Sequence, residues 1–335
     1  MKPPFYHLTI LPPKMPRAEA LSQEISALQR HFGGELNFLN PNRFSPLPIP
    51  RLLFGFHQLA RLRRVEVNFG VHHIFNPDPF PFPILRFLHR PVIYAITGGI
   101  AYPPNSAFFN RLAATVVPDE RSLVQLKSAG VKNVVLIRPG IATRKFTVTP
   151  TPQSDTIHLL VASAPWTKTQ FATKGIDALL EAARHNPQLR LTFLWRGVLF
   201  DEMMRRVEKF GVENQVTIIN KLTNVNTVLA TVHATVALAT EAGIVKSYPH
   251  SLLDSLAAGK PVLVNRAIPM ADFVAERGCG LVLDSVNAAA VSTAVTAMVQ
   301  NYQQLVNATH AIERDTFSIS AMVAAYRIIY ERVSL

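Results

Sequence analysis

Apolar runs of strand length alternate with segments of helical periodicity along most of this 335-residue chain. In the first half, the runs at 92–96, 114–117 and 134–137 are continuously apolar, and a segment with helical spacing, 120–129, separates the last two. Continuous apolar strands are typical of parallel sheets covered by helices on both faces. The pattern therefore predicts an α/β fold built on parallel sheets.

The chain opens with a predicted strand at 6–11 and a predicted helix at 17–32. A second alternating series predicts strands at 157–163, 190–195, 215–219, 234–239 and 261–265, and helices at 175–185, 200–210, 223–231 and 251–258. Between the two series, residues 147–156 have little apolar content and no periodicity. We therefore expect two Rossmann-like, doubly wound domains, 1–150 and 151–315, that face each other across a cleft, with ligands at the carboxyl ends of the strands.

Composition excludes several classes of protein. Apolar residues make up 48% of the chain and charged residues 17%, which excludes a disordered chain or a coiled coil. No run approaches the roughly 18 consecutive apolar residues of a membrane span, and the N-terminus lacks the apolar core of a signal peptide, so we expect a cytoplasmic protein. The single cysteine, Cys279, excludes an internal disulfide and has no Cys or His neighbour at metal-ligand spacing.

Charge is distributed unevenly along the chain. Residues 1–150 hold 18 Lys and Arg against 7 Asp and Glu, whereas residues 151–335 hold 16 against 15. This asymmetry predicts an anionic partner for the first half: a phospholipid surface, a lipid-linked phosphate or a nucleic acid. We do not expect nucleic acid, because the chain has no zinc finger, no basic zipper and no Lys/Arg-Gly-Phe strand motif.

A basic and apolar segment, residues 43–64, contains five arginines among Leu and Phe residues. A helix of this composition can lie on an anionic membrane surface, which would place the protein peripherally on the inner face of the membrane. The alternative is a helix packed into the core with a solvated basic edge.

The segment of residues 246–264 carries the most chemical information. Ser251 fits the N-cap of a helix, Asp254 three residues later resembles a capping box, and Gly259 suits a left-handed helix end. These residues can therefore serve only to start and stop a helix. The functional interpretation is that backbone amides at the helix start hold a phosphate while Asp254 accepts hydrogen bonds from ribose hydroxyls.

From about Val116 to the end, the chain resembles the family-four (group 1) retaining glycosyltransferases, whose architecture of two Rossmann-like domains is called GT-B. The resemblance rests on motifs in the order and spacing of that family, namely Tyr248-Pro249, residues 251–254 and residues 257–262, with weaker matches at residues 137–141, Lys174-Gly175, Gly197 and residues 278–280. It implies that residues 316–335 form a helix that packs back on the N-terminal domain.

The resemblance also implies an activity: transfer of a sugar from a nucleotide-sugar donor to a glycan or lipid-linked acceptor, with retention of configuration and without a metal ion or other cofactor. No Asp-x-Asp metal motif is present. Fixed cations and amides stabilise the charge that develops on a departing nucleoside diphosphate. By resemblance, the donor site comprises the catalytic cation Lys174, the amides of Ser251 and Leu252, the ribose ligand Asp254, and Lys221 and Ser247.

Two departures from the family affect this donor site. Lys246 stands where the family has the first glutamate of a pair of acids. We assign it a catalytic position, where it could meet an acidic sugar or a phosphate, or mark a lost activity. The arginine expected after the first strand of the second domain is missing, and Arg196 could replace it; alternatively, Arg196 is a surface residue stacked on Trp195. A non-catalytic GT-B protein that binds a nucleotide sugar or glycan is the competing hypothesis.

The acceptor side, in the first domain, shows weaker resemblance. Gly98 and Gly99 follow a predicted strand where the family often has a histidine, and they would allow close approach of an acceptor or form an ordinary tight turn. His72 is either an acceptor ligand or a structural histidine with its hydrogen bonds satisfied inside the fold.

Overall fold

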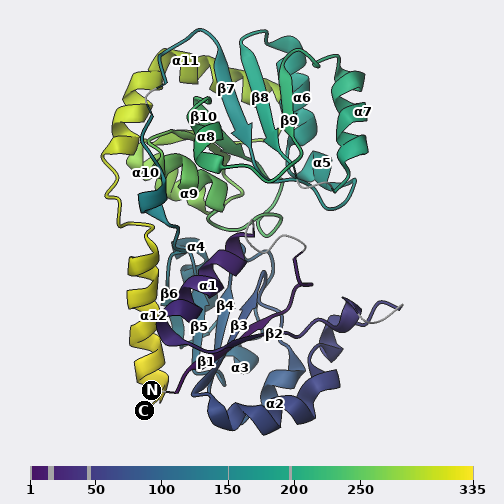
Figure 1. The fold of residues 1–335 in the computed structure, drawn as a ribbon, viewed down its shortest axis with the longest axis vertical. Coiled ribbons are helices and arrows are strands. Elements are labelled where there is room, and N and C mark those ends of the chain that lie inside the picture. Colours follow the sequence, from purple (N-terminus) through teal and green to yellow (C-terminus); the bar gives the residue numbers. More distant parts are fainter. Residues whose placement is uncertain (1, 14–18, 44–46, 150, 196–197, 335) are drawn as a thin grey trace. The chain divides into compact units, whose positions relative to one another are not determined.

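The computed structural model describes residues 2–13, 19–43, 47–149, 151–195 and 198–334 (Figure 1). The chain divides into two compact units. Unit 1 comprises Met1–Ile141 and Phe317–Leu335, and unit 2 comprises Ala142–Thr316.

Unit 1 is built on a six-stranded parallel sheet in the order β2-β1-β3-β4-β5-β6. Its strands are β1 (Pro4–Leu8), β2 (Glu35–Phe38), β3 (Val71–Asn76), β4 (Val92–Ile96), β5 (Ala114–Val117) and β6 (Val134–Leu136). Because the chain runs from β1 outward to β2 and then returns to place β3 on the other side of β1, the order reverses between β1 and β3. Ligands of open α/β sheets bind at such switch points, beyond the carboxyl ends of the strands.

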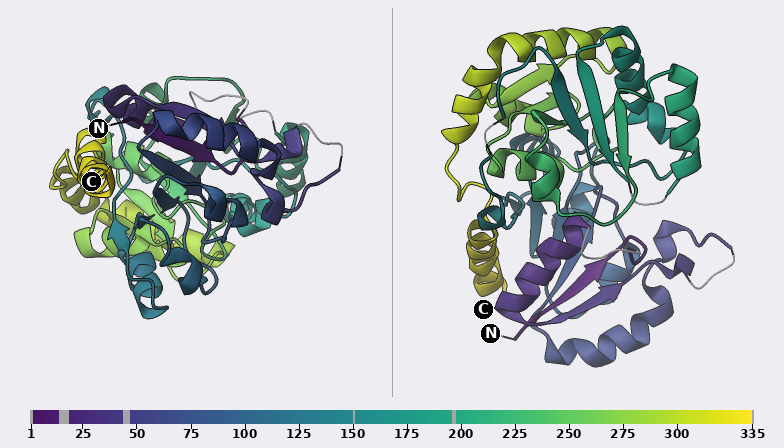
Figure 2. Two further views of the ribbon diagram at one scale, coloured as in Figure 1. Left: turned by 90° about the horizontal axis from the view of Figure 1, so that it is seen from below. Right: turned by 45° about the horizontal axis from the view of Figure 1, so that its top comes forward.

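Helices cover both faces of this sheet (Figures 1 and 2). They are α1 (Ala20–Phe32), α2 (Leu59–Val65), α3 (Ser106–Phe109), α4 (Glu120–Ser128) and α12 (Ile319–Ser334), with short 3₁₀ turns η2 (Pro41–Arg43), η3 (Arg51–Leu53), η4 (Phe56–Gln58), η5 (Glu66–Asn68) and η6 (Pro83–Phe87). Neighbouring strand residues enter opposite cores: Tyr6 packs with α1 and α12, whereas Phe5 packs with α2, α3 and α4. The C-terminal helix α12 thus belongs to the core of unit 1.

Unit 2 repeats the architecture with a six-stranded parallel sheet in the order β12-β11-β10-β7-β8-β9. Its strands are β7 (Ile157–Val161), β8 (Leu189–Leu194), β9 (Val216–Ile219), β10 (Ala234–Ala237), β11 (Val262–Asn265) and β12 (Gly280–Leu283). Its helices are α5 (Gln170–Thr173), α6 (Ile176–His185), α7 (Phe200–Phe210), α8 (Val225–Leu229), α9 (His250–Ala257), α10 (Met270–Arg277) and α11 (Ala288–His310), after the turn η7 (Thr143–Lys145). The order reverses between β7 and β10, which is the switch point of this unit. The predicted α/β fold is confirmed.

The segment 147–156, in which the sequence analysis placed the domain boundary, is bonded to unit 2. The Thr147 amide donates to Asn226 Oδ1 at 3.0 Å, Thr151 Oγ1 donates to the Val232 carbonyl at 3.2 Å, and Gln153 Nε2 donates to the Val299 carbonyl at 3.1 Å. A polar segment without periodicity can therefore be anchored by its own side chains.

Local differences from the predicted elements have identifiable causes. Residues 43–64 do not form one helix: Gly55 has a left-handed backbone (φ 85°), and the described residues 51–64 form the two short turns η3 and η4 and most of the seven-residue α2. The first strand covers 4–8 rather than 6–11, because Thr9 leaves the ladder to bond Asn76. Strand β3 was not predicted, because two histidines and an asparagine interrupt its apolar pattern.

Among the described residues, no helix combines the length and the apolar character that crossing a bilayer requires.

Candidate functional site

The loops that follow β7 and β10 meet at the switch point of unit 2. The Thr240 amide, in the loop after β10, donates to the Thr173 carbonyl at 2.9 Å, at the end of α5. Beside it, Gly175 has a left-handed backbone (φ 67°), and a Cβ there would lie 2.8 Å from Leu238. Close packing of these two loops therefore fixes the position of Lys174, which lies between Thr173 and Gly175.

Lys174 is buried, and its Nζ donates a hydrogen bond to the Ala164 carbonyl, after β7, at 3.0 Å. A lysine stem enclosed by protein holds its ammonium group in a narrow range of positions. Lys174 is thus a fixed cation at the carboxyl edge of the sheet, where the sequence analysis placed a diphosphate ligand.

The start of α9 differs from the prediction. The helix begins at His250 with Pro249 at the N-cap position, so Ser251 lies inside the first turn and is not the capping residue. The Leu252 amide, predicted to hold a phosphate, donates to the Pro249 carbonyl at 3.0 Å. The Ser251 amide makes no bond to a backbone carbonyl in the described part of the chain, so it is the predicted amide left to meet an anion.

Ser247 is completely buried, and its hydroxyl has no hydrogen-bond partner among the described residues. Its carbonyl accepts the Met270 amide at 3.0 Å, which fixes the backbone just before α9. A buried hydroxyl without a partner is costly, by about 1–3 kcal/mol. The adjacent Lys246 is partly buried on the same loop.

Asp254 lies one turn into α9 and is partly buried. Burial raises the pKa of its carboxyl group to about 7, because the charged form is poorly solvated there. A carboxylate in this environment gains from a ligand that donates hydrogen bonds, as ribose hydroxyls do. Gly259, after α9, has the predicted left-handed backbone (φ 73°).

Asn265 at the end of β11 was not predicted to contribute. Its side-chain amide donates to the Ala239 carbonyl at 2.7 Å, and its Oδ1 accepts the Ala239 amide at 2.8 Å. This pair of bonds holds the start of the loop that carries Ser247. An asparagine after an apolar strand is a sequence signal that could have identified it.

Two further predicted donor residues, Lys221 and Arg196, are not among the buried groups described above. Lys221 is exposed after β9. Arg196 and Gly197 lie outside the described residues. In the described part of the chain, no three His, Cys, Asp or Glu side chains come together as a metal site would require.

The assignment of His72 to an acceptor site is wrong. His72 is completely buried in β3, where one ring nitrogen lies 2.9 Å from His7 Nε2 and the other lies 3.0 Å from Glu66 Oε2. Burial lowers the pKa of His72 despite the neighbouring Glu66 carboxylate. Both ring nitrogens are used within the fold, so this is a structural histidine.

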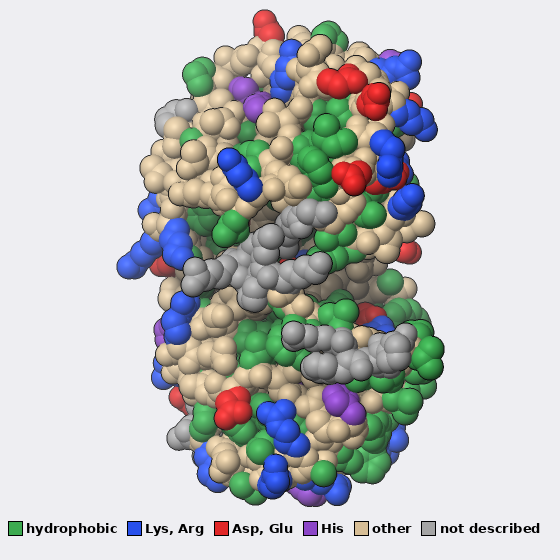
Figure 3. All heavy atoms as spheres, turned by 45° about the vertical axis from the view of Figure 1, so that its right-hand side comes forward, with side chains coloured by type: hydrophobic (Ala, Val, Ile, Leu, Met, Phe, Trp, Pro, Cys, Tyr) green, Lys and Arg blue, Asp and Glu red, His purple; other side chains and the backbone are tan. Residues whose placement is uncertain are grey.

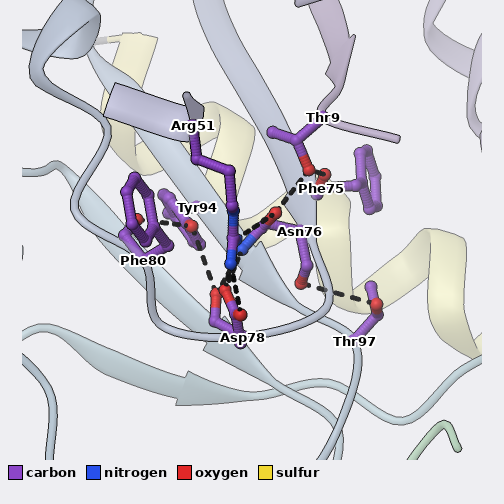
Figure 4. Close-up of polar contacts among 8 residues, drawn as sticks. All are labelled: Thr9, Arg51, Phe75, Asn76, Asp78, Phe80, Tyr94 and Thr97. Atoms are coloured by element: carbon purple, nitrogen blue, oxygen red, sulfur yellow. Dashed lines mark hydrogen bonds and ion pairs between the residues drawn. The ribbon is translucent and has the colours of Figure 1, made fainter. Parts of the chain in front are cut away.

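Gly98 and Gly99 are buried directly after β4. The Gly98 amide donates to the Pro77 carbonyl at 2.9 Å, which joins the ends of β4 and β3. Beside them lies a cluster that the sequence analysis missed: Thr9, Arg51, Asn76, Asp78, Tyr94 and Thr97 (Figure 4).

Comparison with known proteins gives a family for unit 2 and a fold for the chain. Residues 168–314 match the sequence profile of the family described as glycosyl transferases group 1. This segment contains Lys174 and the whole loop from β10 to α9. No curated protein matches the chain by sequence.

Several solved glycosyltransferase structures are similar to the chain over its full length. HepE of Anabaena, solved with UDP, superposes with a TM-score of 0.70 at 13% identity, over 100% of each chain. Sucrose-phosphate synthase of Thermosynechococcus elongatus gives 0.70 at 12% identity, over 99% of each chain. The lipopolysaccharide outer core galactosyltransferase WaaB gives 0.65 at 9% identity, over 99% of each chain. The shared fold is GT-B. By sequence, residues 168–314 of unit 2 are thus similar to the group 1 glycosyltransferases, and the chain as a whole shares the GT-B fold of the solved glycosyltransferases.

Proposed function

We propose that the chain transfers a sugar from a nucleotide-sugar donor bound by unit 2 to a glycan or lipid-linked acceptor bound by unit 1. The observation that supports this proposal most is the buried Ser247 hydroxyl, which has no hydrogen-bond partner among the described residues. Ser247 lies before α9, on the loop that the Thr240 amide joins to the end of α5. HepE was solved with UDP and with UDP-glucose, which makes these two molecules the first probes.

The diphosphate of the donor binds at the switch point of unit 2. Its oxygens accept hydrogen bonds from the Ser247 hydroxyl and the Ser251 amide, while the Lys174 ammonium group exchanges the Ala164 carbonyl for a phosphate oxygen. The positive end of the α9 dipole adds to this attraction. Asp254 accepts hydrogen bonds from the ribose hydroxyls.

Catalysis requires stabilisation of the charge that accumulates on the diphosphate as its bond to the sugar breaks. Lys174 and the α9 amide are held in place before the reaction, so their stabilisation costs no reorganisation. In our proposal this cation and the amide stabilise the negative charge of the leaving diphosphate, which other enzymes stabilise with a metal ion. Retention of configuration is part of the proposal and rests on the resemblance to the family alone.

Lys246 gives the donor site its own specificity. A cation beside the donor sugar favours an acidic sugar or a phosphate-bearing one over a neutral sugar. We therefore expect Lys246→Glu to shift the preferred donor toward neutral sugars, measured as the ratio of kcat/KM for UDP-glucuronate and UDP-glucose.

We also propose a peripheral contact between unit 1 and the anionic inner face of a membrane. The exposed surface of residues 47–64 supports this second proposal. Leu47, Leu52 and Leu53 are 74%, 54% and 53% exposed, which is unusual for leucine. Exposed arginines accompany them at positions 61, 63 and 64. In Figure 3, hydrophobic side chains gather at the lower right of the face shown. Apolar insertion and attraction of basic groups to anionic lipid act together in such contacts.

A panel of nucleotide sugars tests the proposal, with binding and released nucleoside diphosphate both measured. Binding and turnover with a matching acceptor support it. Binding that never leads to transfer or hydrolysis with any acceptor would instead favour the non-catalytic protein. A lack of binding to every nucleotide would contradict the proposed donor site.

A further inference from the structure

The polar cluster of unit 1 lies at the switch point of its sheet. Thr9 follows β1 and Asn76 ends β3, the two strands between which the order reverses, and the Thr9 hydroxyl donates to Asn76 Oδ1. On the other side, the Thr97 amide after β4 donates to the Asn76 carbonyl at 2.9 Å. Asn76 thus links three strand ends at the edge where α/β sheets bind ligands.

Arg51 and Asp78 form an ion pair within the cluster (Figure 4). The guanidinium group donates to both carboxylate oxygens of Asp78, at 2.6 and 2.8 Å. Its Cζ lies 4.2 Å from the centroid of the Phe80 ring, so the guanidinium is held against an aromatic face. The side chains of Arg51 and Asp78 are 40% and 26% exposed.

Buried groups hold this ion pair in place. Asn76 Nδ2 donates to Asp78 Oδ1 at 2.6 Å, and the Tyr94 hydroxyl donates to the Asp78 carbonyl at 3.2 Å. Burial raises the pKa of Asp78, but the hydrogen bond and positive charge of Arg51 and the hydrogen bonds from Asn76 and Tyr102 together outweigh it, and the pKa lies below its usual value. Asp78 is therefore a carboxylate at neutral pH.

The pair still offers hydrogen bonds to a ligand. Three of the five N–H groups of Arg51 donate to Asp78 and Asn76, which leaves two. The Asp78 carboxylate accepts two bonds from Arg51 and one from Asn76, out of the about four that a carboxylate can accept. Neighbouring hydroxyls of a sugar ring both donate and accept, so they match a carboxylate beside a guanidinium. The phenol of Tyr102, on an exposed side chain, lies within hydrogen-bonding reach of both Arg51 and Asp78 and is a further polar group of the site.

The balance of charge sets the chemistry of the ligand. Unit 1 is strongly basic overall, yet at its switch point the positive charge of Arg51 is neutralised by Asp78. An anionic ligand would have to compete with a carboxylate held by two short bonds, whereas a neutral hydroxylated ring would not. Resting on the proposed function, we propose that Arg51 and Asp78 hold the hydroxyls of a neutral sugar ring in the acceptor, and that the basic surface elsewhere on unit 1 meets any anionic part.

Direct sugar binding tests this proposal independently of turnover. Saturation-transfer NMR on the full chain would use the methyl glycosides of glucose, galactose and mannose as neutral probes, and glucuronate and galacturonate as acidic probes. We expect at least one neutral glycoside to bind more tightly than both acids. Asp78→Asn keeps the shape of the side chain but leaves Arg51 uncompensated. We expect it to weaken neutral binding about tenfold, as for loss of one charge-assisted hydrogen bond, and to strengthen binding of the acids.

The matched control is Glu120→Gln, which makes the same charge change in unit 1 at an exposed ion pair with Arg138. It should leave both kinds of probe unaffected. If Asp78→Asn does not fold, as judged by circular dichroism, Tyr102→Phe decides, because it removes the hydroxyl beside Arg51 and Asp78 without changing the charge of the site, and it should weaken neutral binding alone. Tighter binding of an acid by the unmodified chain, failure of every neutral glycoside to bind, or an unchanged preference in Asp78→Asn would each overturn the proposal.

UDP binding separates this result from the proposed function. Asp78→Asn should bind UDP as the unmodified chain does, since the nucleotide site is assigned to unit 2. A chain that binds neutral glycosides but no nucleotide would retain the sugar site and contradict the proposed donor site. A chain that binds UDP but binds an acidic sugar more tightly than every neutral glycoside would retain the proposed donor site and contradict the sugar site.

Discussion

Single side chains at the switch point of unit 2 lack partners that a ligand can supply. Ser247 has a buried hydroxyl without a hydrogen bond among the described residues, and Asp254 has a poorly solvated carboxyl group with a pKa raised to about 7. Groups of this kind destabilise the ligand-free protein and strengthen binding of a ligand that satisfies them.

Asp254 makes the ligand-free protein less stable as the pH rises. Its pKa is about 7 in the folded chain against a reference value of 3.8, so between these values the folded state holds more protons than the unfolded state. Stability from this group therefore falls as pH rises through that window, by at most about 1.4 kcal/mol per pH unit. We expect Asp254→Asn to raise the free energy of unfolding at pH 8 by at least about 1 kcal/mol and to have little effect at pH 4. Denaturant titrations at the two pH values measure this, and an equal effect at both would contradict it.

The same carboxylate should make nucleotide binding depend on pH. Because ribose hydroxyls bond best to the ionised form, UDP affinity should increase from pH 6 to pH 8. The diphosphate of UDP also titrates in this range, with a pKa of about 6. The variant Asp254→Asn removes the titrating carboxyl group and leaves only the titration of UDP. Calorimetry should show that this variant binds UDP about tenfold more weakly at pH 8 and that its pH dependence is that of UDP alone.

At the scale of elements, α9 and its preceding loop depend on contacts from neighbouring strands. Asn265 holds the loop through two hydrogen bonds to Ala239 and is buried. Asn265→Ala leaves the amide and carbonyl of Ala239 without these partners, which should destabilise unit 2 by about 2–3 kcal/mol. The same variant should weaken UDP binding, because the position of Ser247 depends on this loop. Asn301→Ala, at an exposed position on α11, is the control. Loss of stability with unchanged UDP affinity would show that the loop does not depend on Asn265.

The helices and strands also show which structural features could be predicted from the sequence and which could not. The predicted helix 200–210 is confirmed as α7, because a clear apolar stripe and Gly211 define it locally. Strand β3 was missed, because its histidines bond to groups from other segments: His72 to His7 and Glu66, and His73 to the Tyr330 hydroxyl. The pair of Arg51 and Asp78 was missed for a related reason: the two residues lie in separate irregular segments, and only the topology of the sheet brings them together. Contacts between distant segments leave little local signal.

At the scale of the whole molecule, the uneven charge of the chain leads to a test of the proposed contact with anionic membranes. Residues 1–150 carry nearly all of the net charge of +12. Binding to vesicles with anionic lipid should weaken as salt rises, because screening shortens the range of the attraction. Replacement of Arg61, Arg63 and Arg64 by glutamine should reduce binding about tenfold or more, at roughly 1 kcal/mol per basic residue. Replacement of Lys209 and Arg205, exposed on α7, should have no such effect. Vesicle co-sedimentation measures this, and equal binding to neutral vesicles would contradict the assignment.

We propose that Lys174 stabilises a departing nucleoside diphosphate, and the rate of diphosphate release from a nucleotide sugar by Lys174→Met tests this role most directly. Methionine keeps the buried stem and removes the charge. With the best donor in the panel, we predict that kcat falls by about a hundredfold or more, as for other groups that stabilise charge in the transition state. Thermal unfolding should show that the variant is folded. The control variant Lys209→Met should retain full activity. A folded Lys174→Met variant with the kcat of the unmodified chain would contradict the account.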